Sequence, residues 1–142
     1  MPRPLSESNS YIDITNEKIR IYKRLDSLSG ESEIQRLKSQ IEDRFGTMPV
    51  ELSNLFFVVR IRNLGEVLGF EKIIIKNGLM ILFFIANPMS AYYKSERFGK
   101  ILGKINSDSS LFNLKQNEGK LKIVIRGVDS LEKSYGILER LQ

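Results

Sequence analysis

Residues 34–49, IQRLKSQIEDRFGTMP, predict a helix that stops abruptly and a second helix that begins a few residues later. The apolar residues of the first helix recur every three or four positions and therefore share one face. They are Ile34, Leu37, Ile41 and Phe45. Gly46 can adopt the left-handed backbone conformation that closes a helix end. Pro49 has no N–H to leave unpaired in a first helical turn, so it is suited to begin the next helix.

Asp43 is the unusual residue of this stretch. It lies in the last turn of the predicted helix, where the negative end of the helix dipole disfavours a carboxylate. One interpretation is a local ion pair with Arg44, Arg60 or Arg62, which contributes little if it is exposed. The other is that Asp43 accepts an arginine from a partner protein, where a desolvated pair matters more. The residues alone leave both interpretations open, whereas Phe45 is most simply a core residue.

The remaining pattern predicts the α+β class with a mainly antiparallel sheet. Asn77-Gly78 between two β-branched or aromatic runs is typical of a hairpin, because both turn residues need positive φ. The run 79–85 lacks polar alternation, which predicts a central strand buried on both faces. Three N-terminal helices are followed by two β-hairpins, with one helix between the hairpins and one C-terminal helix. The predicted helices cover about 15–28, 32–45, 49–68, 90–105 and 129–141, and the strands cover 72–76, 79–85, 111–116 and 120–126.

The chain length of 142 residues fits a single domain with its own core. Residues 1–10 are rich in Pro, Ser and Asn without periodicity, so we expect a linker or lead-in over residues 1–14, followed by one domain over residues 15–142. A start inside a linker hints at a fragment of a longer chain. The longest apolar run is too short to span a bilayer, and the N-terminus does not resemble a signal peptide. We therefore expect a cytoplasmic protein that does not contact membranes.

The residue types argue against catalysis by this chain. There is no cysteine, hence no thiolate or disulfide, and no histidine, the commonest general base and metal ligand. The sequence contains no phosphate-binding loop, dinucleotide fingerprint, HExxH or GxSxG motif. Glu42 and Asp43 are adjacent carboxylates, but neighbours on a helix point about 100° apart and do not face one substrate. We expect no catalytic residue, cofactor or metal site.

The formal net charge of +5 is concentrated in the second half of the chain and predicts two basic surfaces. The predicted helix 90–105 carries Lys94, Arg97, Lys100 and Lys104, and the last hairpin carries Lys115, Lys120, Lys122 and Arg126. Either set is suited to contact phosphates, which would give salt-dependent affinity for nucleic acid. The simpler interpretation is a solvated face. No aromatic residue alternates with the basic positions of the last strand to stack bases, which favours that simpler interpretation.

Two stretches resemble the C-terminal domain of bacterial transcription-repair coupling factor. They are YIDITNEKIRIYKRLDSL and IEDRFGTMPVELSNLFFVVRIRNLGEVLGF. The family pattern is an IYKRL helix, a DRFG..P helix break and a following helix that ends in LG[IF]. In this sequence the pattern corresponds to Ile21–Leu25, Asp43–Pro49 and Leu68–Phe70. The resemblance is specific over about residues 11–85, and beyond them only the order of elements matches.

The resemblance implies a regulatory, non-catalytic role in transcription-coupled nucleotide excision repair. In this family a multidomain protein displaces stalled RNA polymerase with an ATP-driven DNA translocase and recruits the damage-recognition ATPase of excision repair (UvrA). The terminal domain docks on the N-terminal repair-recruitment module, masks it and restrains the motor, which lies in other domains. The implied partner interface comprises Asp43, Gln40 and Arg44; Asp43 matches the family aspartate, whereas Gln40 stands where an acidic residue is often found. The alternative function is a nucleic-acid-binding module that uses the basic hairpin and the fourth helix.

Overall fold

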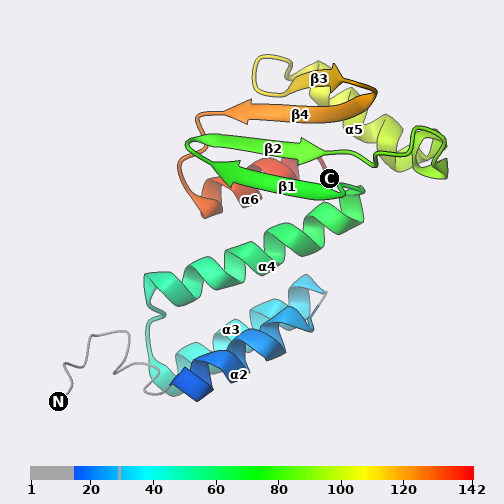
Figure 1. Cartoon of the computed structure of the whole chain (residues 1–142). Coiled ribbons are helices and arrows are strands. Elements are labelled where there is room, and N and C mark those ends of the chain that lie inside the picture. Colours follow the sequence, from blue (N-terminus) through cyan, green and yellow to red (C-terminus); the bar gives the residue numbers. More distant parts are fainter. Residues whose placement is uncertain (1–14, 29) are drawn as a thin grey trace. The chain divides into compact units, whose positions relative to one another are not determined.

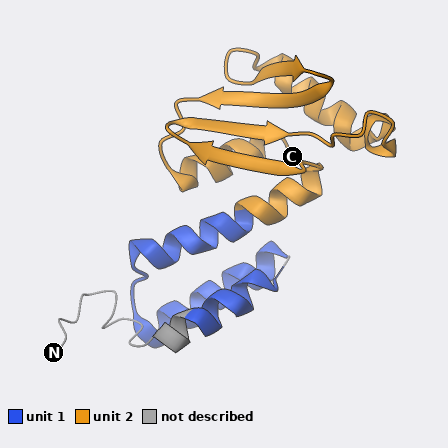
Figure 2. Ribbon diagram, in the orientation of Figure 1, with its two compact units in different colours: residues 1–60 blue, residues 61–142 orange. Residues whose placement is uncertain are grey.

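The computed structural model describes residues 15–28 and 30–142 (Figure 1). The chain divides into two compact units, residues 1–60 (unit 1) and residues 61–142 (unit 2), and the boundary lies within one helix (Figure 2). The predicted lead-in over residues 1–14 lies outside the described residues, and the single domain over 15–142 stays a prediction. Among the described residues, no helix combines the length and the apolar character needed to cross a membrane.

Unit 1 contains the predicted N-terminal helices. They are α2 (Thr15–Asp26), α3 (Glu31–Phe45) and the first part of α4 (Val50–Leu68). One hydrophobic cluster joins them, because each helix turns its apolar stripe inward. The buried members of this cluster are Ile21, Leu25, Ile34, Leu37, Ile41, Leu52, Phe56 and Val59. Phe45 is partly buried against the same cluster, which confirms the prediction that it is a core residue.

The predicted stop after α3 is confirmed at Gly46. Its φ of 94° lies in the region that favours glycine, and its N–H donates to the carbonyl of Glu42 at 2.8 Å. The next helix follows at once, since the N–H of Ser53 donates to the carbonyl of Pro49 at 3.0 Å. A bidentate ion pair then ties the start of α3 to α4, with Arg60 Nε and Nη2 at 3.0 and 2.8 Å from the Glu31 carboxylate oxygens.

Unit 2 is built around one antiparallel sheet, which confirms the α+β class. The strand order is β1 (Lys72–Lys76), β2 (Leu79–Phe83), β4 (Lys120–Arg126) and β3 (Asn113–Asn117). Helices α5 (Glu96–Ser107) and α6 (Leu131–Arg140) lie on the same face of this sheet (Figure 1). Both hairpin turns have two residues at positive φ, Asn77-Gly78 and Glu118-Gly119.

The prediction that the second strand is central is confirmed, but the prediction that it is buried on both faces was wrong. Met80 and Leu82 are fully buried, whereas Leu79, Ile81 and Phe83 alternate with them and are partly exposed. The reason is that α5 and α6 lie on the face that carries Met80 and Leu82. Phe84 continues that face and contacts Phe98 of α5, with ring centroids 5.4 Å apart.

The predicted fourth helix is divided into two. A short 3-10 helix, η1 (Ala91–Lys94), precedes α5, and Ser95 between them is extended, with φ −82° and ψ 155°. The Ser95 hydroxyl accepts from the N–H of Phe98 at 3.2 Å and thereby caps a new helix. Lys94 therefore lies on η1, and the prediction that it shares one helix face with Arg97, Lys100 and Lys104 was wrong.

The end of α4 is in contact with η1. Phe70 N–H donates to the carbonyl of Gly65 at 2.9 Å and Gly69 N–H to that of Glu66 at 3.1 Å, the hydrogen bonds of a Schellman motif. The Tyr92 hydroxyl of η1 donates to the Leu68 carbonyl at 2.6 Å, and burial raises the pKa of Tyr92 to about 12. A Cβ at Gly69 would lie 2.1 Å from Tyr92 Cε1, so only glycine admits this ring.

We expect Gly69→Ala to destabilise the chain by about 2–4 kcal/mol, because positive φ and the contact with Tyr92 both act against the added methyl group. The matched control is Gly127→Ala, which has φ of 73° but no atom within 4 Å of the added Cβ. Gly127→Ala should lower the free energy of unfolding by only about 1–2 kcal/mol. Urea denaturation followed by circular dichroism measures both. Equal losses for the two variants would contradict the role assigned to Tyr92.

Candidate protein-interaction site

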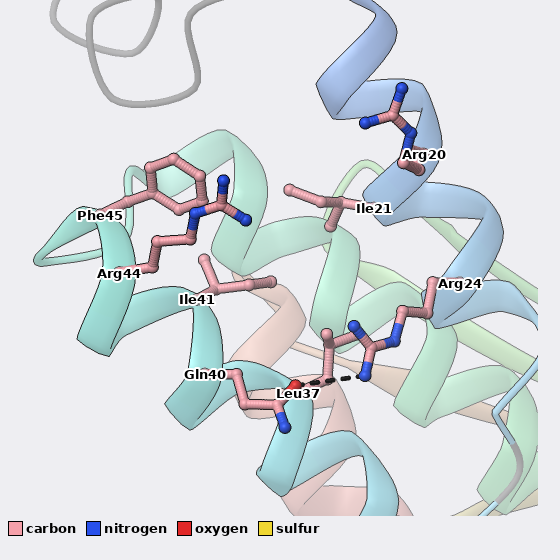
Figure 3. Close-up of a pocket in the computed structure, with 8 residues that line it drawn as sticks. All are labelled: Arg20, Ile21, Arg24, Leu37, Gln40, Ile41, Arg44 and Phe45. Carbon is pink, nitrogen blue, oxygen red and sulfur yellow. Dashed lines mark hydrogen bonds between the residues drawn. The ribbon is translucent and has the colours of Figure 1, made fainter.

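Helices α2 and α3 enclose a surface hollow of about 280 Å³ in unit 1, which we call the arginine hollow (Figure 3). Its residues come from one face of each helix, where consecutive lining residues are one or three positions apart. They are Arg20, Ile21 and Arg24 of α2 and Leu37, Gln40, Ile41, Arg44 and Phe45 of α3. Ile21, Leu37 and Ile41 also belong to the core of unit 1, so the floor of the hollow is apolar and its rim is basic.

One hydrogen bond links the two sides of the arginine hollow. Arg24 Nη2 donates to Gln40 Oε1 at 3.2 Å (Figure 3). On the same helix as Gln40, the Arg44 guanidinium carbon lies 5.1 Å from the centroid of the Phe45 ring, within the range of a cation–π contact. The lining contains Arg20, Arg24 and Arg44 but no carboxylate. The hollow therefore presents positive charge and hydrogen-bond donors beside an apolar floor.

The structure places two of the three predicted interface residues in the hollow and the third outside it. Gln40 and Arg44 line it, whereas Asp43 does not. Asp43 is exposed in the last turn of α3, turned by about 100° from Arg44. It forms no ion pair or hydrogen bond with the described residues of unit 1.

The arginines considered as local partners of Asp43 are engaged elsewhere. Arg44 lies over Phe45, Arg60 binds Glu31, and Arg62 donates to Asn63 Oδ1 at 3.3 Å. The local ion-pair interpretation of Asp43 is thus not supported, and the carboxylate stays accessible at the unfavourable end of the helix dipole.

Sequence reasoning missed Arg20 and Arg24 as neighbours of Gln40. Arg20 and Arg24 are four residues apart in the sequence, which was the available signal, since this spacing places both along one edge of the apolar stripe of α2. Periodicity assigns them to a helix face but does not say which residue of another helix they will meet. The Arg24–Gln40 hydrogen bond joins residues 16 positions apart and depends on the packing of α2 against α3.

The two predicted basic surfaces do not join into one. Lys120, Lys122 and Arg126 alternate along β4 with Ile123 and Ile125, which are fully buried on the face where α5 lies. The basic residues of β4 therefore lie on the opposite face of the sheet from α5, which carries Arg97, Lys100 and Lys104. In the part of the chain that the structure describes, no group of three or more His, Cys, Asp or Glu residues is placed to hold a metal ion.

The fold is thus an α+β arrangement, with a helical unit followed by a unit built on a four-stranded antiparallel sheet, and the surface features described above are groups of charged residues. The sequence matches the TRCF domain family over residues 5–95, more than half of its length. The chain belongs to the TRCF domain family.

Curated relatives and a solved structure agree with this assignment. The chain is 30% identical to the transcription-repair-coupling factor of Rickettsia prowazekii over 121 residues, which is 85% of this chain and 10% of the relative. It is 32% identical to that of Rickettsia typhi over 120 residues, or 84% and 10% of the two chains. The chain therefore spans about a tenth of the length of these relatives. A crystal structure of the C-terminal domain of transcription-repair coupling factor shares the fold, with a TM-score of 0.71 and 19% identity over 94% of this chain and 79% of that one.

We expect Gln40→Glu to stabilise unit 1 by about 0.5 kcal/mol at low salt, because the new carboxylate would accept from Arg24 and also lie four residues before Arg44. High salt should remove the gain. The matched control is Ser39→Glu, which adds the same charge one residue earlier on the exposed part of α3. Thermal unfolding at two salt concentrations measures the effect, and an equal gain in the control would exclude a specific pairing with Arg24.

Proposed function

We propose that this chain is a regulatory, non-catalytic domain of a bacterial transcription-repair coupling factor. In this proposal residues 1–14 are a lead-in, and residues 15–142 are one domain that docks on the N-terminal repair-recruitment module of the same protein. Docking masks the module and restrains the ATP-driven DNA translocase until RNA polymerase is engaged. Membership of the TRCF domain family supports the parent protein, and the docking mechanism is our inference.

The observation that supports the proposal is the exposed carboxylate of Asp43, which has no ion-pair or hydrogen-bond partner among the described residues of unit 1. A carboxylate in the last turn of α3 lies where the partial negative charge of the free carbonyl groups opposes it. An arginine from a partner would remove this penalty, and its planar guanidinium can donate two hydrogen bonds to one carboxylate. Asp43 therefore has the chemistry of an acceptor for a basic residue of another protein surface.

The arginine hollow gives the same surface a second and opposite charge. Arg44 follows Asp43 directly in α3, and Gln40 lies one turn earlier. A partner that offers an arginine to Asp43 and an acidic group to the hollow would match both charges at once. Such alternating charges set the register of an interface and disfavour other partners more than they raise affinity. Gln40 is neutral and can form hydrogen bonds. An acidic residue at this position would weaken the positive charge of the hollow.

The wider partners belong to the parent protein in this proposal. The chain spans about a tenth of its curated relatives, so the translocase and its ATP site would lie in the remaining part of the parent. RNA polymerase and the damage-recognition ATPase would then be affected indirectly, through release of the masked module. The setting would be the bacterial cytoplasm, where transcription and excision repair take place.

We expect Asp43→Ala to weaken binding of the 142-residue chain to the purified N-terminal module at least tenfold. Truncating one partner of a desolvated ion pair costs about 2 kcal/mol or more, and about 1.4 kcal/mol corresponds to a factor of ten. Isothermal titration calorimetry measures the affinity, and circular dichroism checks that the variant is folded.

The matched control for this experiment is Glu42→Ala. It removes the same charge from the neighbouring exposed position, which points about 100° away from Asp43. The control should bind within about twofold of the unchanged chain. An unchanged affinity for Asp43→Ala would refute the role of Asp43 in docking. Equal weakening of binding in both variants would show that only the net charge of this helix end matters. If the unchanged chain does not bind the module, the docking proposal fails.

A second experiment tests the restraint itself in the parent protein. Deletion of residues 11–142 should raise the ATPase rate in the absence of polymerase and increase recruitment of the damage-recognition ATPase, because the masking surface is gone. Asp43→Ala in the intact parent should raise both in the same direction to a smaller extent. Unchanged rates and unchanged recruitment after the deletion would contradict the restraint.

A further inference from the structure

The face of the sheet opposite α5 and α6 carries a row of residues that only strand register brings together. We call the side of the sheet that carries Lys72 and Phe83 the open face. Lys72 of β1 pairs with Phe83 of β2, Phe83 pairs with Lys122 of β4, and Lys122 pairs with Lys115 of β3. Directly paired residues point to the same face, so these four side chains cross the whole sheet in one line.

Positive charge dominates this open face. A second row crosses the sheet, in which Leu79 of β2 pairs with Lys76 of β1 on one side and with Arg126 of β4 on the other. Lys120 lies two residues before Lys122 on β4 and adds a further cation beside the first row. The sequences of the four strands contain no acidic residue at all. Between the two basic rows lie Ile74, Ile81 and Val124, which pair with one another across β1, β2 and β4. The open face is therefore a flat apolar strip between cations, with the potential to attract an anionic partner.

Phe83 is the aromatic residue at the centre of the first row. The Lys72 and Lys122 ammonium nitrogens lie 5.7 and 5.8 Å from the centroid of its ring. The ring is partly exposed, whereas Phe84, the next residue, is 2% exposed on the other face. Cation–π contacts at exposed sites are weak, so both lysines can move off the ring to meet an anion while the ring accepts a flat apolar group.

A hollow of about 430 Å³ adjoins the Phe83 ring, which we call the Phe83 hollow. Its volume lies within the range of sites for small organic groups. One wall carries Glu71, whose Oε2 atom accepts from the N–H of Ala86 at 2.8 Å and is thereby fixed in place. Lys72 of β1 and Lys120 of β4 also line this hollow. The full lining is Glu71, Lys72, Phe83, Phe84, Ala86, Lys120 and Leu121.

We propose that the open face binds single-stranded nucleic acid without sequence preference. A base stacks on Phe83 and enters the adjoining hollow, and Lys72, Lys122 and Lys115 contact successive phosphates across the sheet. An aromatic platform flanked by cations is how sequence-tolerant single-strand binders combine stacking with backbone contacts. The Phe83 ring and its hollow favour this ligand over an acidic peptide, which would use the lysines but needs no flat ring.

Strand register supplies the aromatic residue that β4 itself lacks. Within β4 no aromatic residue alternates with the basic positions, but the register brings Phe83 from β2 between Lys72 and Lys122. The binding surface is the open face alone, without the basic residues of α5 on the other side of the sheet. It is independent of Asp43 and of the docking proposed above.

The test is fluorescence anisotropy with a labelled oligothymidylate of about ten nucleotides and the 142-residue chain, at salt concentrations from about 50 to 200 mM. Phe83→Leu keeps the apolar bulk and removes the aromatic platform, so it should weaken binding about five- to hundredfold. The double variant Lys115→Gln/Lys122→Gln should lower the slope of log affinity against log salt by about 1.4. The matched control Lys100→Gln/Lys104→Gln on α5 removes the same charge and should leave the slope nearly unchanged.

Several results would overturn the proposal. One is the absence of binding at the lowest salt. Another is an affinity unaffected by Phe83→Leu while the thermal unfolding curve of the variant is unchanged. A third is an equal loss of salt dependence in the control variant Lys100→Gln/Lys104→Gln. Competition by a decaglutamate peptide as effective as competition by unlabelled oligothymidylate would reassign the face to acidic protein segments. Competition by duplex DNA as effective as by single strands would exclude the stacking on Phe83. Because the readout is nucleic-acid binding, failure here leaves the docking of Asp43 untouched, and failure of docking leaves this proposal untouched.

Discussion

The pairing of β2 with both β1 and β4 is the interaction on which unit 2 depends. It buries Met80 and Leu82 completely and gives α5 and α6 one apolar face to pack on. Because side chains alternate along a strand, burying one face commits every second residue to the other. The basic row around Phe83 is thus a direct consequence of the register that forms the core. A shift of one residue would turn these lysines toward the helices.

Helix termination plays the corresponding part in unit 1. Gly46 ends α3 within one turn of Asp43, so the carboxylate stays at the unfavourable end of the dipole instead of in the middle of a longer helix. The same end of α3 places Gln40 and Arg44 in the arginine hollow. Arg20 and Arg24, which are one turn apart on α2, line the same hollow. Charge of both signs therefore meets at one helix end. Such a surface suits a specific protein partner better than a polyanion, which would be repelled by Asp43.

The open face of the sheet has the opposite character. Its strands carry lysine and arginine but no acid, and the apolar strip between the basic rows stays partly exposed except at Val124, which is buried. The two units thus present surfaces of different chemistry. One is a mixed-charge helix end and the other a uniformly basic sheet with one aromatic ring. A domain that docks through the mixed-charge helix end would leave the open face of unit 2 free for another ligand.

The sequence by itself determined the local features. Hydrophobic periodicity, Gly46 with Pro49 and the Asn77-Gly78 turn were enough for the helix order, the helix stop and the hairpins, because each depends on residues close together in the chain. The unfavourable position of Asp43 in the last turn of its helix was predicted in the same way. Only the tertiary structure decided the neighbours of Gln40, the break that separates Lys94 from α5 and the position of Phe83 between lysines of β1 and β4. These arrangements come from packing and register between segments far apart in sequence, and periodicity within one segment carries no information about them.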